Sequence, residues 1–385
     1  MTTSRALART TATAALAAAA LLLTGCMQGG PAGTSGATGS DAAEAPVPAA
    51  FLSPTAGEAP EGALADTRMT YVGFGGGYQD AQMSEVVEPF AAHTGATVVG
   101  DGPADLAKLR AQVESGAVTW DTVESSPVPA TANCGTLFEP LDTSLIDLSA
   151  IPDELPTGEC FVPIMVYAYT VFYDAQKYAE NPPTTLADFF DTEKYPGTRG
   201  IEGRATPSPG VYELALMADG VAPEELYPLD TDRALGVYDR LGEDVKFWTT
   251  GAEQTQLVQG GEVDMLIGWT GRIPEANLTG ADFAPIWDHG IMDSDVLTVT
   301  KGSSNSLASH ALINWFIGAD QQTAHAEGTA YPPVNPQATP TLSPEFARFD
   351  VTDPEVLPQL VKPDHAYWAE NYDSLTATWH DYVTH

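Results

Sequence analysis

The amino-acid sequence predicts an α/β fold built as two lobes or domains. Between residues 68 and 99 a strand, a glycine turn, a helix, a glycine stop and a second strand follow one another. This order is typical of a βαβ unit, whose strands pair in parallel. Strand-like and helix-like segments keep alternating further along the chain. Roughly 315 residues are left for folding, which favours more than one domain.

The first unit is the most clearly patterned part of the chain. Residues 68–74 alternate as a half-buried strand does and lead into a run of glycines. A helix follows, because its apolar residues recur at the spacing of one helical face. The residues of that face are Met83, Val86, Val87 and Phe90. Gly95 is suited to end the helix, since glycine readily adopts the left-handed conformation of a C-terminal cap.

The remaining segments repeat this alternation without an internal repeat of 20–50 residues. Strands are expected at 96–99, 120–123, 161–173 and 263–269, and helices at 108–115, 186–190, 211–217, 255–259 and 308–317. Apolar, β-rich runs of this length are typical of buried strands. We therefore expect an α/β protein with two or more sheets.

The first 25 residues have the organisation of a secretory signal peptide. Arg5 and Arg9 precede an apolar run at 14–23, which is too short to span a bilayer stably. The run LTGC at residues 23–26 resembles the bacterial lipobox, in which the cysteine thiol receives a diacylglycerol. We expect lipidation of Cys26 and anchoring to the outer face of the cytoplasmic membrane, the alternative being an ordinary signal peptide.

A linker is expected to separate this anchor from the folded part. Residues 26–67 are rich in Gly, Ala, Pro, Ser and Thr and show no apolar periodicity. Such a segment buries too little apolar surface to fold, so we expect it to be disordered. About 40 flexible residues have a root-mean-square reach of roughly 30–40 Å. A folded body on this tether would stay near the membrane and reorient freely.

The chain is strongly acidic, with 16 Lys and Arg against 52 Asp and Glu and a formal net charge of −36. A protein without a basic face does not bind nucleic acid. Small cations are attracted by such a charge, whereas anionic ligands are repelled. The acids are spread along the chain, which is also typical of adaptation to salt or of general solubility.

Two cysteines, Cys134 and Cys160, remain after Cys26. In an exported protein an even pair favours a structural disulfide. Neither has a histidine close in sequence, as a metal site would require. Closing the loop between them would stabilise the fold by roughly 3 kcal/mol.

The sequence lacks the motifs of the common enzyme classes. The glycines at 73–77 follow a strand but lack the third glycine of G-x-G-x-x-G, and the chain has no P-loop, G-x-S-x-G or H-E-x-x-H motif. His289 lies among Asp288, Asp293 and Asp295, which could ligate a cation, but a solvated loop explains one histidine among acids in an acidic protein better. We expect neither a metal, nor a cofactor, nor catalysis. A secreted enzyme on a two-lobed scaffold is the remote alternative.

Several stretches, in order, resemble the spermidine/putrescine-binding family of ABC importer receptors. They are FGGGYQDAQ at 74–82, VEPF at 87–90, TG at 94–95, WDTV at 120–123, FEPLD at 138–142, YPGTRGI at 195–201, ELALMADGV at 213–221, GEVDM at 261–265, GWTGR at 268–272 and YPPVN at 331–335. Each stretch alone is weakly specific. Together they span most of the part that is expected to fold.

The resemblance implies a type II periplasmic-binding-protein fold, in which a hinge joins two lobes, each a sheet flanked by helices, and the ligand lies between them. Lobe 1 would comprise 68–165 and 300–345, and lobe 2 would comprise 166–299. Residues 346–385 would pack on the body as helices, with their aromatic residues in the core. The partners would be a small amine and the permease and ATPase of an importer, and the protein would be a monomer. A sensory role is the alternative to transport.

The resemblance also implies a ligand site. Its aromatic residues correspond to Phe74 or Tyr78 in the glycine turn, to Trp269 and to Tyr331. Its carboxylate corresponds to Asp295, because the run LTVTKG at 297–302 follows it as in the family. Aromatic faces attract a desolvated ammonium by roughly 1–2 kcal/mol each, and a carboxylate fixes its position.

The sequence departs from the polyamine pattern at two positions. Asp293 stands where polyamine binders tend to have an aromatic residue, and Arg272 lies close behind Trp269. A guanidinium about 6 Å from a ligand ammonium costs roughly 3 kcal/mol at an effective dielectric near 20. Arg272 therefore either pairs with a protein acid such as Glu275 or binds a ligand carboxylate. The first option suits putrescine or spermidine, and the second suits a zwitterionic ω-amino acid such as 4-aminobutyrate.

Overall fold

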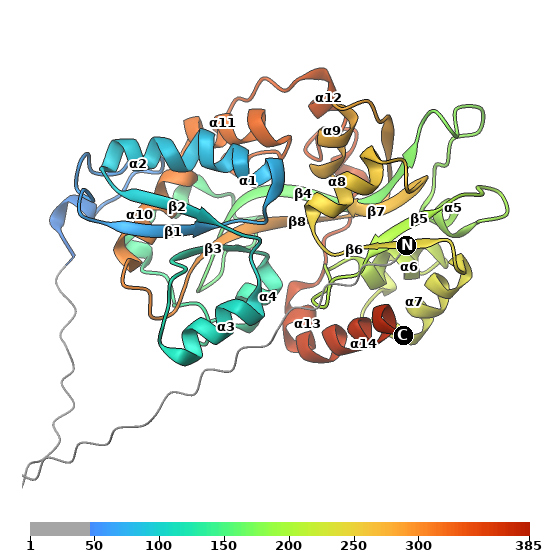
Figure 1. Cartoon of the computed structure of the whole chain (residues 1–385), viewed down its shortest axis with the longest axis horizontal. Helices are drawn as coiled ribbons and strands as arrows, with labels where there is room; N and C mark the ends of the chain where they lie inside the picture. Colours follow the sequence, from blue (N-terminus) through green and yellow to red (C-terminus); the bar gives the residue numbers. More distant parts are fainter. Residues whose placement is uncertain (1–46) are drawn as a thin grey trace, which may run out of the picture. The chain divides into compact units, whose positions relative to one another are not determined.

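A mixed β-sheet flanked by helices forms the centre of residues 47–385, the part of the chain that the computed structural model describes (Figure 1). The strands are β1 (Arg68–Val72), β2 (Thr97–Asp101), β3 (Thr122–Ser125), β4 (Val162–Asp174), β5 (Arg199–Glu202), β6 (Val245–Trp248), β7 (Met265–Trp269) and β8 (Phe283–Val299). Their order in the sheet is β2-β1-β3-β8-β4-β7-β5-β6. The predicted α/β class is confirmed. The predicted signal peptide and Cys26 lie outside the described residues. The prediction of a disordered linker up to residue 67 is wrong for residues 47–67, which pack on the body: Phe51 and Leu64 are buried, and the N–H of Gly57 donates to the carbonyl oxygen of Asn314.

Helices flank both the β2-β1-β3 part and the β7-β5-β6 part of the sheet (Figure 1). They are α1 (Gly76–Gln82), α2 (Glu88–Thr94), α3 (Leu106–Ser115), α4 (Pro127–Ala132), α5 (Leu186–Phe190), α6 (Val211–Ala218), α7 (Thr231–Tyr238), α8 (Gly251–Gln259), α9 (Arg272–Asn277), α10 (Ser306–Phe316), α11 (Ala319–Thr329), α12 (Pro344–Ala347), α13 (His365–Glu370) and α14 (Tyr372–Thr384). None of these helices within residues 47–385 is long and apolar enough to cross a membrane.

The βαβ unit predicted at the start of the folded part is confirmed. Strand β1 pairs in parallel with β2 and with β3. The predicted apolar face is buried, with Val86, Val87 and Phe90 fully inaccessible to solvent. Gly95 caps α2 in the left-handed conformation, at φ 79°. The helix is not regular throughout, because a π-helical turn at Met83–Val87 separates α1 from α2.

Two long antiparallel strands join the parallel parts of the sheet. Strand β4 has 13 residues and β8 has 17, so at about 3.3 Å per residue each extends well beyond an ordinary strand. β8 pairs with β3 and β4, while β4 also pairs with β7. The separate sheets that the sequence suggested are therefore one hydrogen-bonded sheet. The predicted lobe boundaries fall within β4 and at the end of β8, and the division into lobes stays a prediction.

The C-terminal helices pack through tryptophans. Trp368 of α13 and Trp379 of α14 are fully buried. The Trp368 indole donates to Glu213 of α6 at 2.6 Å, and the hydroxyl of Tyr212, also on α6, donates to the backbone of α14. Both helices also contact α4, which belongs to the opposite part of the sheet (Figure 1). The two tryptophans are core residues, as the sequence predicts.

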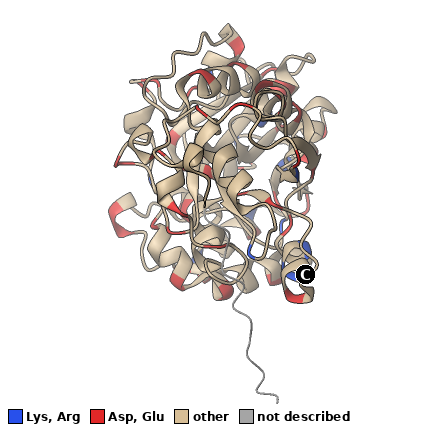
Figure 2. Ribbon diagram, turned by 90° about the vertical axis from the view of Figure 1, so that its left-hand side faces the viewer, with Lys and Arg blue, Asp and Glu red and all other residues tan. Residues whose placement is uncertain are grey.

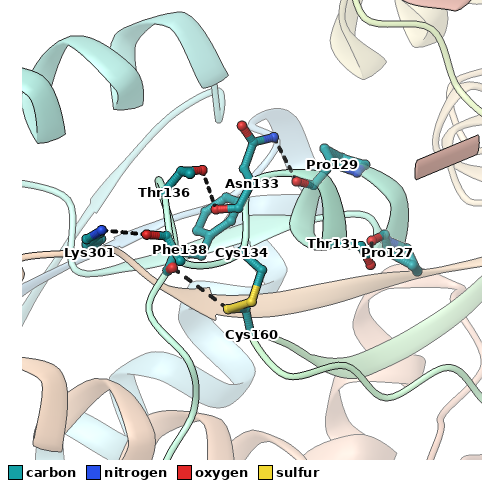
Figure 3. Close-up of a disulfide and its surroundings, with 10 residues drawn as sticks. Pro127, Pro129, Thr131, Asn133, Cys134, Thr136, Phe138, Cys160 and Lys301 are labelled. Atoms are coloured by element: carbon teal, nitrogen blue, oxygen red, sulfur yellow. Dashed lines mark hydrogen bonds between the residues drawn. A yellow bond between two sulfur atoms is a disulfide. The ribbon is translucent and has the colours of Figure 1, made fainter. Parts of the chain in front are cut away.

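Cys134 and Cys160 form a disulfide, with Cα atoms 5.6 Å apart (Figure 3). The bond ties the segment after α4 to the start of β4, and both cysteines contact an apolar cluster that includes Trp120 and Phe138. The predicted pairing is confirmed. The bridge closes a loop of 26 residues.

We expect the variant Cys134→Ala/Cys160→Ala to lose about 3 kcal/mol of unfolding free energy, because the unfolded chain regains the entropy of the open loop. Urea unfolding of the oxidised protein and of the double variant measures the loss. The single variant Cys134→Ala is the control, since it breaks the same bond and keeps one thiol. Equal stability of the wild type and both variants would contradict the expectation.

Trp379→Ala is expected to destabilise the fold by about 3–5 kcal/mol, because it leaves a cavity between α14 and α6. Thermal unfolding followed by near-ultraviolet circular dichroism is a suitable measurement. Leu357→Ala, at a side chain that is 42% exposed, serves as the control and should change little. A small effect of Trp379→Ala would mean that the C-terminal helices fold independently of the rest of the body.

Candidate ligand-binding site

Four of the residues predicted for the ligand site lie together, with Tyr331, Arg272 and Asp295 around the hydroxyl and ring of Tyr78. Tyr78 is on α1, and its ring centroid is 5.1 Å from that of Tyr331, nearly perpendicular to it. The guanidinium carbon of Arg272 lies 4.8 Å from the same centroid. The Tyr78 hydroxyl is 3.4 Å from Oδ2 of Asp295. Residues separated by up to about 250 positions in the chain therefore meet at one place.

Glycines make room for this arrangement. A Cβ atom on Gly251, at the start of α8, would lie 2.4 Å from Nε of Arg272. A Cβ on Gly271 would lie 2.2 Å from the Tyr331 ring. Real Cβ atoms do not approach other atoms this closely. Gly271, the second glycine of the GWTGR run, is therefore needed because the Tyr331 ring packs directly on its backbone.

Arg272 is held by the glycine turn that precedes α1. The residue is buried, and its Nη1 donates to the carbonyl oxygen of Gly75 at 3.2 Å. Its Nε has no hydrogen-bond partner within residues 47–385. No ion pair joins Arg272 to Glu275 in this part of the chain, and Glu275 instead accepts from the Thr255 hydroxyl at 3.4 Å. The protein acid that the sequence offered as a partner for Arg272 therefore does not neutralise it.

A second buried carboxyl group, Glu124, adjoins Asp295 and was not predicted from the sequence. Glu124 lies on β3 opposite Leu297 of β8, which puts its side chain on the same face of the sheet as Asp295. Its Oε1 accepts short hydrogen bonds from Tyr78 and, at 3.0 Å, from Gln82. The signal that could have found it is a carboxyl residue directly after the buried WDTV strand.

Burial changes the protonation of both carboxyl groups. It raises the pKa of Glu124 to about 7, although hydrogen bonds from Tyr78 and Gln82 and the charge of Arg272 act in the opposite direction. The pKa of Asp295 is also raised well above its usual value, first by burial and then by the nearby charges of Glu124 and Asp293.

Arg204 is a second cation at the site, and the sequence did not single it out. Its guanidinium carbon lies 5.3 Å from the ring centroid of Trp269, and its Nη1 lies 3.5 Å from Glu202. The charges of Arg272 and Arg204 both favour the ionised form of Asp295 and lower its pKa. Arg204 follows β5 by two residues, close behind the YPGTRGI run. Its contact with Trp269 depends on the pairing of β5 with β7.

The other predicted residues lie at the edges of this cluster. Trp269 is half-buried and packs edge-to-face on Trp248, with centroids 4.7 Å apart. Phe74 is also half-buried, and its backbone N–H acts to lower the pKa of Glu124. Their placement near a ligand stays a prediction.

Asp293, which departs from the polyamine pattern, pairs with the C-terminal part of the chain. Its Oδ1 lies 2.9 Å from Nε2 of His365 at the start of α13, and this carboxylate raises the pKa of His365 against the effect of burial. His289 pairs with Asp288 at 2.6 Å near the surface. Within residues 47–385, no group of three or more His, Cys, Asp or Glu side chains could hold a metal ion.

The acidic character of the chain is distributed rather than local. Figure 2 shows Asp and Glu on helices and loops across the whole view, with few Lys and Arg among them. The two arginines, Arg272 buried and Arg204 partly exposed, are therefore unusual in their surroundings, because they lie close together in a protein with a net charge of −36.

The chain is similar in sequence to bacterial solute-binding proteins. Residues 85–356 match the model of the bacterial extracellular solute-binding protein family. The gamma-aminobutyric acid-binding protein of Pseudomonas aeruginosa is 30% identical over 317 residues, which cover 80% of this chain and 88% of that protein. The spermidine/putrescine-binding periplasmic protein of Escherichia coli is 22% identical over 229 residues, covering 59% of this chain and 63% of its own.

Two solved structures share the fold along almost their full length. The Atu4243 GABA receptor is 33% identical, covers 82% of this chain and 98% of its own, and superposes with a TM-score of 0.73. AgtB from A. tumefaciens R10, solved with agropinic acid, is 32% identical, covers 83% and 99%, and has a TM-score of 0.75. Solute-binding proteins of this kind are components of ABC-type transport rather than enzymes. The chain thus belongs to the bacterial extracellular solute-binding protein family, as its resemblance to the polyamine-binding receptors predicts.

Proposed function

We propose that this protein is the exported substrate-binding subunit of an ABC importer and that its ligand is a zwitterionic ω-amino acid of the 4-aminobutyrate type. The observation that carries the ligand class is the buried guanidinium of Arg272, which packs on Tyr78 and has an unpartnered Nε among the described residues. It lies in one cluster with the carboxyl group of Asp295. A ligand with one positive and one negative end would use both.

The same charges disfavour a polyamine. A second ammonium about 6 Å from a guanidinium costs roughly 3 kcal/mol at an effective dielectric near 20, and Arg204 adds a further positive charge beside Trp269. A ligand carboxylate removes this penalty, because the planar guanidinium donates to both of its oxygens. The relatives that bind gamma-aminobutyric acid support this assignment, whereas the polyamine-binding relatives support only the transport class.

Binding would take place between the two predicted lobes. Arg272 belongs to the segment predicted as lobe 2, and the carbonyl group of Gly75 that it contacts belongs to lobe 1. Tyr78 and Glu124 also come from lobe 1, while Asp295 lies near the end of the segment assigned to lobe 2. A ligand enclosed by these groups would link residues of both lobes, which is the arrangement that a permease recognises as loaded.

The ligand class is tested by calorimetry with 4-aminobutyrate and putrescine. We expect the wild type to prefer 4-aminobutyrate, and both Arg272→Ala and Asp295→Ala to weaken its binding at least tenfold. Removing one partner of a buried charge pair costs roughly 2–5 kcal/mol. Arg240→Ala, an exposed arginine paired with Asp219, is the matched control and should bind normally. Tight putrescine binding that Arg272→Ala leaves unchanged or improves would establish the polyamine reading instead.

The proposed location rests on Cys26, outside the described residues. If Cys26 carries the lipid anchor, Cys26→Ala should move the protein from the membrane fraction to the medium. Residue 26 then carries no acyl chains, so the exported protein has no anchor in the membrane. Cell fractionation with an antibody against the folded part measures this. Retention of the variant in the membrane fraction would exclude the lipoprotein assignment without affecting the ligand site.

A further inference from the structure

The hydroxyl group of Tyr78 lies against two buried carboxyl groups and has a single proton to donate. It makes a short contact with Oε1 of Glu124 and lies 3.4 Å from Oδ2 of Asp295. An ionised carboxylate only accepts hydrogen bonds. If both groups were ionised, one of the two oxygen contacts would have no hydrogen in it. A proton on one carboxyl group supplies the missing hydrogen.

The second oxygen of Glu124 also indicates that one of the two carboxyl groups is protonated. Oε2 is buried without a hydrogen-bond partner among residues 47–385, as is Oε1 of the neighbouring Gln82. An unpartnered oxygen that carries charge in the interior is far more costly than a neutral one. A protonated Glu124 therefore suits its surroundings better than an ionised one.

The cations around the pair do not balance both carboxylates. The titratable and charged groups that face it are Tyr71, Tyr78, Tyr167, Arg204, Arg272, Asp293, His325 and Tyr331. The tyrosines are neutral, because burial raises the pKa of each. His325 is neutral as well, since burial lowers its pKa to about 3. Asp293 is paired with His365, and Arg204 lies beside Glu202 although its charge also lowers the pKa of Asp295. Arg272 is the cation that lowers the pKa of both carboxyl groups.

We propose that Glu124 and Asp295 share one proton in the ligand-free protein and that the ammonium group of the ligand displaces it. On binding, the ammonium keeps its own hydrogens and pairs with Asp295. The carboxyl O–H bond breaks, the electron pair stays on the carboxylate, and the proton passes to the solvent. Glu124 is a positioning residue, which acts on Asp295 through the Tyr78 hydroxyl. This inference rests on the proposed function and adds a pH dependence to it.

The direction of the pH dependence follows from the protonation states. Burial raises the pKa of Glu124 to about 7 and also raises the pKa of Asp295, so the free protein carries the proton at pH 6 and loses it as the pH rises through the range in which the pair titrates. Below it, the ligand must displace a proton, and affinity rises by up to about tenfold per pH unit as one proton is released. Well above it, no proton remains to be displaced, and affinity no longer changes with pH.

The proton is counted by calorimetry of the full-length protein. Titrating 4-aminobutyrate at each pH in two buffers that both work at that pH and differ in ionisation enthalpy, such as phosphate and imidazole at pH 6, gives the number of protons released per ligand. We expect about one proton at pH 6 and a value near zero at pH 8.5. Glu124→Gln should reduce the release at pH 6, because the pKa of Asp295 falls when the neighbouring charge is removed, although burial still raises it. Tyr78→Phe should also alter the count, since it removes the hydroxyl that links the two groups.

Glu213→Gln is the matched control. Glu213 is another buried glutamate with a raised pKa, on α6 and bonded to Trp368, so its variant should release the same proton as the wild type. Binding of 4-aminobutyrate without proton release at pH 6 would overturn the inference and leave the proposed function intact. A release in Glu124→Gln as large as that of the wild type would overturn it as well. If neither 4-aminobutyrate nor putrescine binds, the proposed function and the inference both fail. If Glu124→Gln does not fold, the number of protons that the wild type releases at pH 6 still tests the inference.

Discussion

The antiparallel pairing of β4 with β8 is the constraint on which the rest of the structure depends. Each part of the sheet beyond these strands is parallel and covered by its own helices, and neither pairs with the other directly. β8 pairs with β3 of one parallel part, and β4 pairs with β7 of the other. The pairing of β4 with β8 therefore fixes the register between the two parts. Asp295 lies on this shared strand, opposite Met165 of β4. Its carboxyl group can therefore lie close both to Glu124, on β3 in one parallel part of the sheet, and to Arg272, which follows β7 in the other.

The same arrangement gives the site its electrostatic character. Two carboxyl groups and a guanidinium are buried in one cluster, where each isolated charge would destabilise the fold. Pairing lessens that cost only in part, because the neutral tyrosines donate hydrogen bonds but carry no charge. Stability alone would favour apolar residues at these positions. Retaining the charges is consistent with a site completed by a ligand that brings charges of both signs, and it explains why cations are gathered here in an acidic chain.

The sequence predicted the fold well where the information is local. The helical face of Val86, Val87 and Phe90 and the cap at Gly95 depend on residues a few positions apart, and the structure confirms them. The single sheet was not predicted because the pairing of β4 with β8 joins segments that are far apart in the sequence, and no local pattern indicates such a pairing. Tyr78, Arg272, Asp295 and Tyr331 were found through a resemblance to known receptors, not through periodicity. Glu124 and Arg204 were missed because their contacts arise only once β3 meets β8 and β5 meets β7.

Backbone shape constrains the site as strongly as charge does. Arg272 lies between the Tyr78 ring and the backbone at Gly251, where no Cβ would fit, and donates to the carbonyl group of Gly75. A planar guanidinium suits such a slot, because it stacks on an aromatic face and donates in its own plane at once. A lysine would bring the same charge but could not make both contacts, so charge conservation alone would not preserve the site. The glycines and the arginine therefore act as one unit: the missing side chains create the space, and the guanidinium fills it while its Nε stays unpartnered among the described residues.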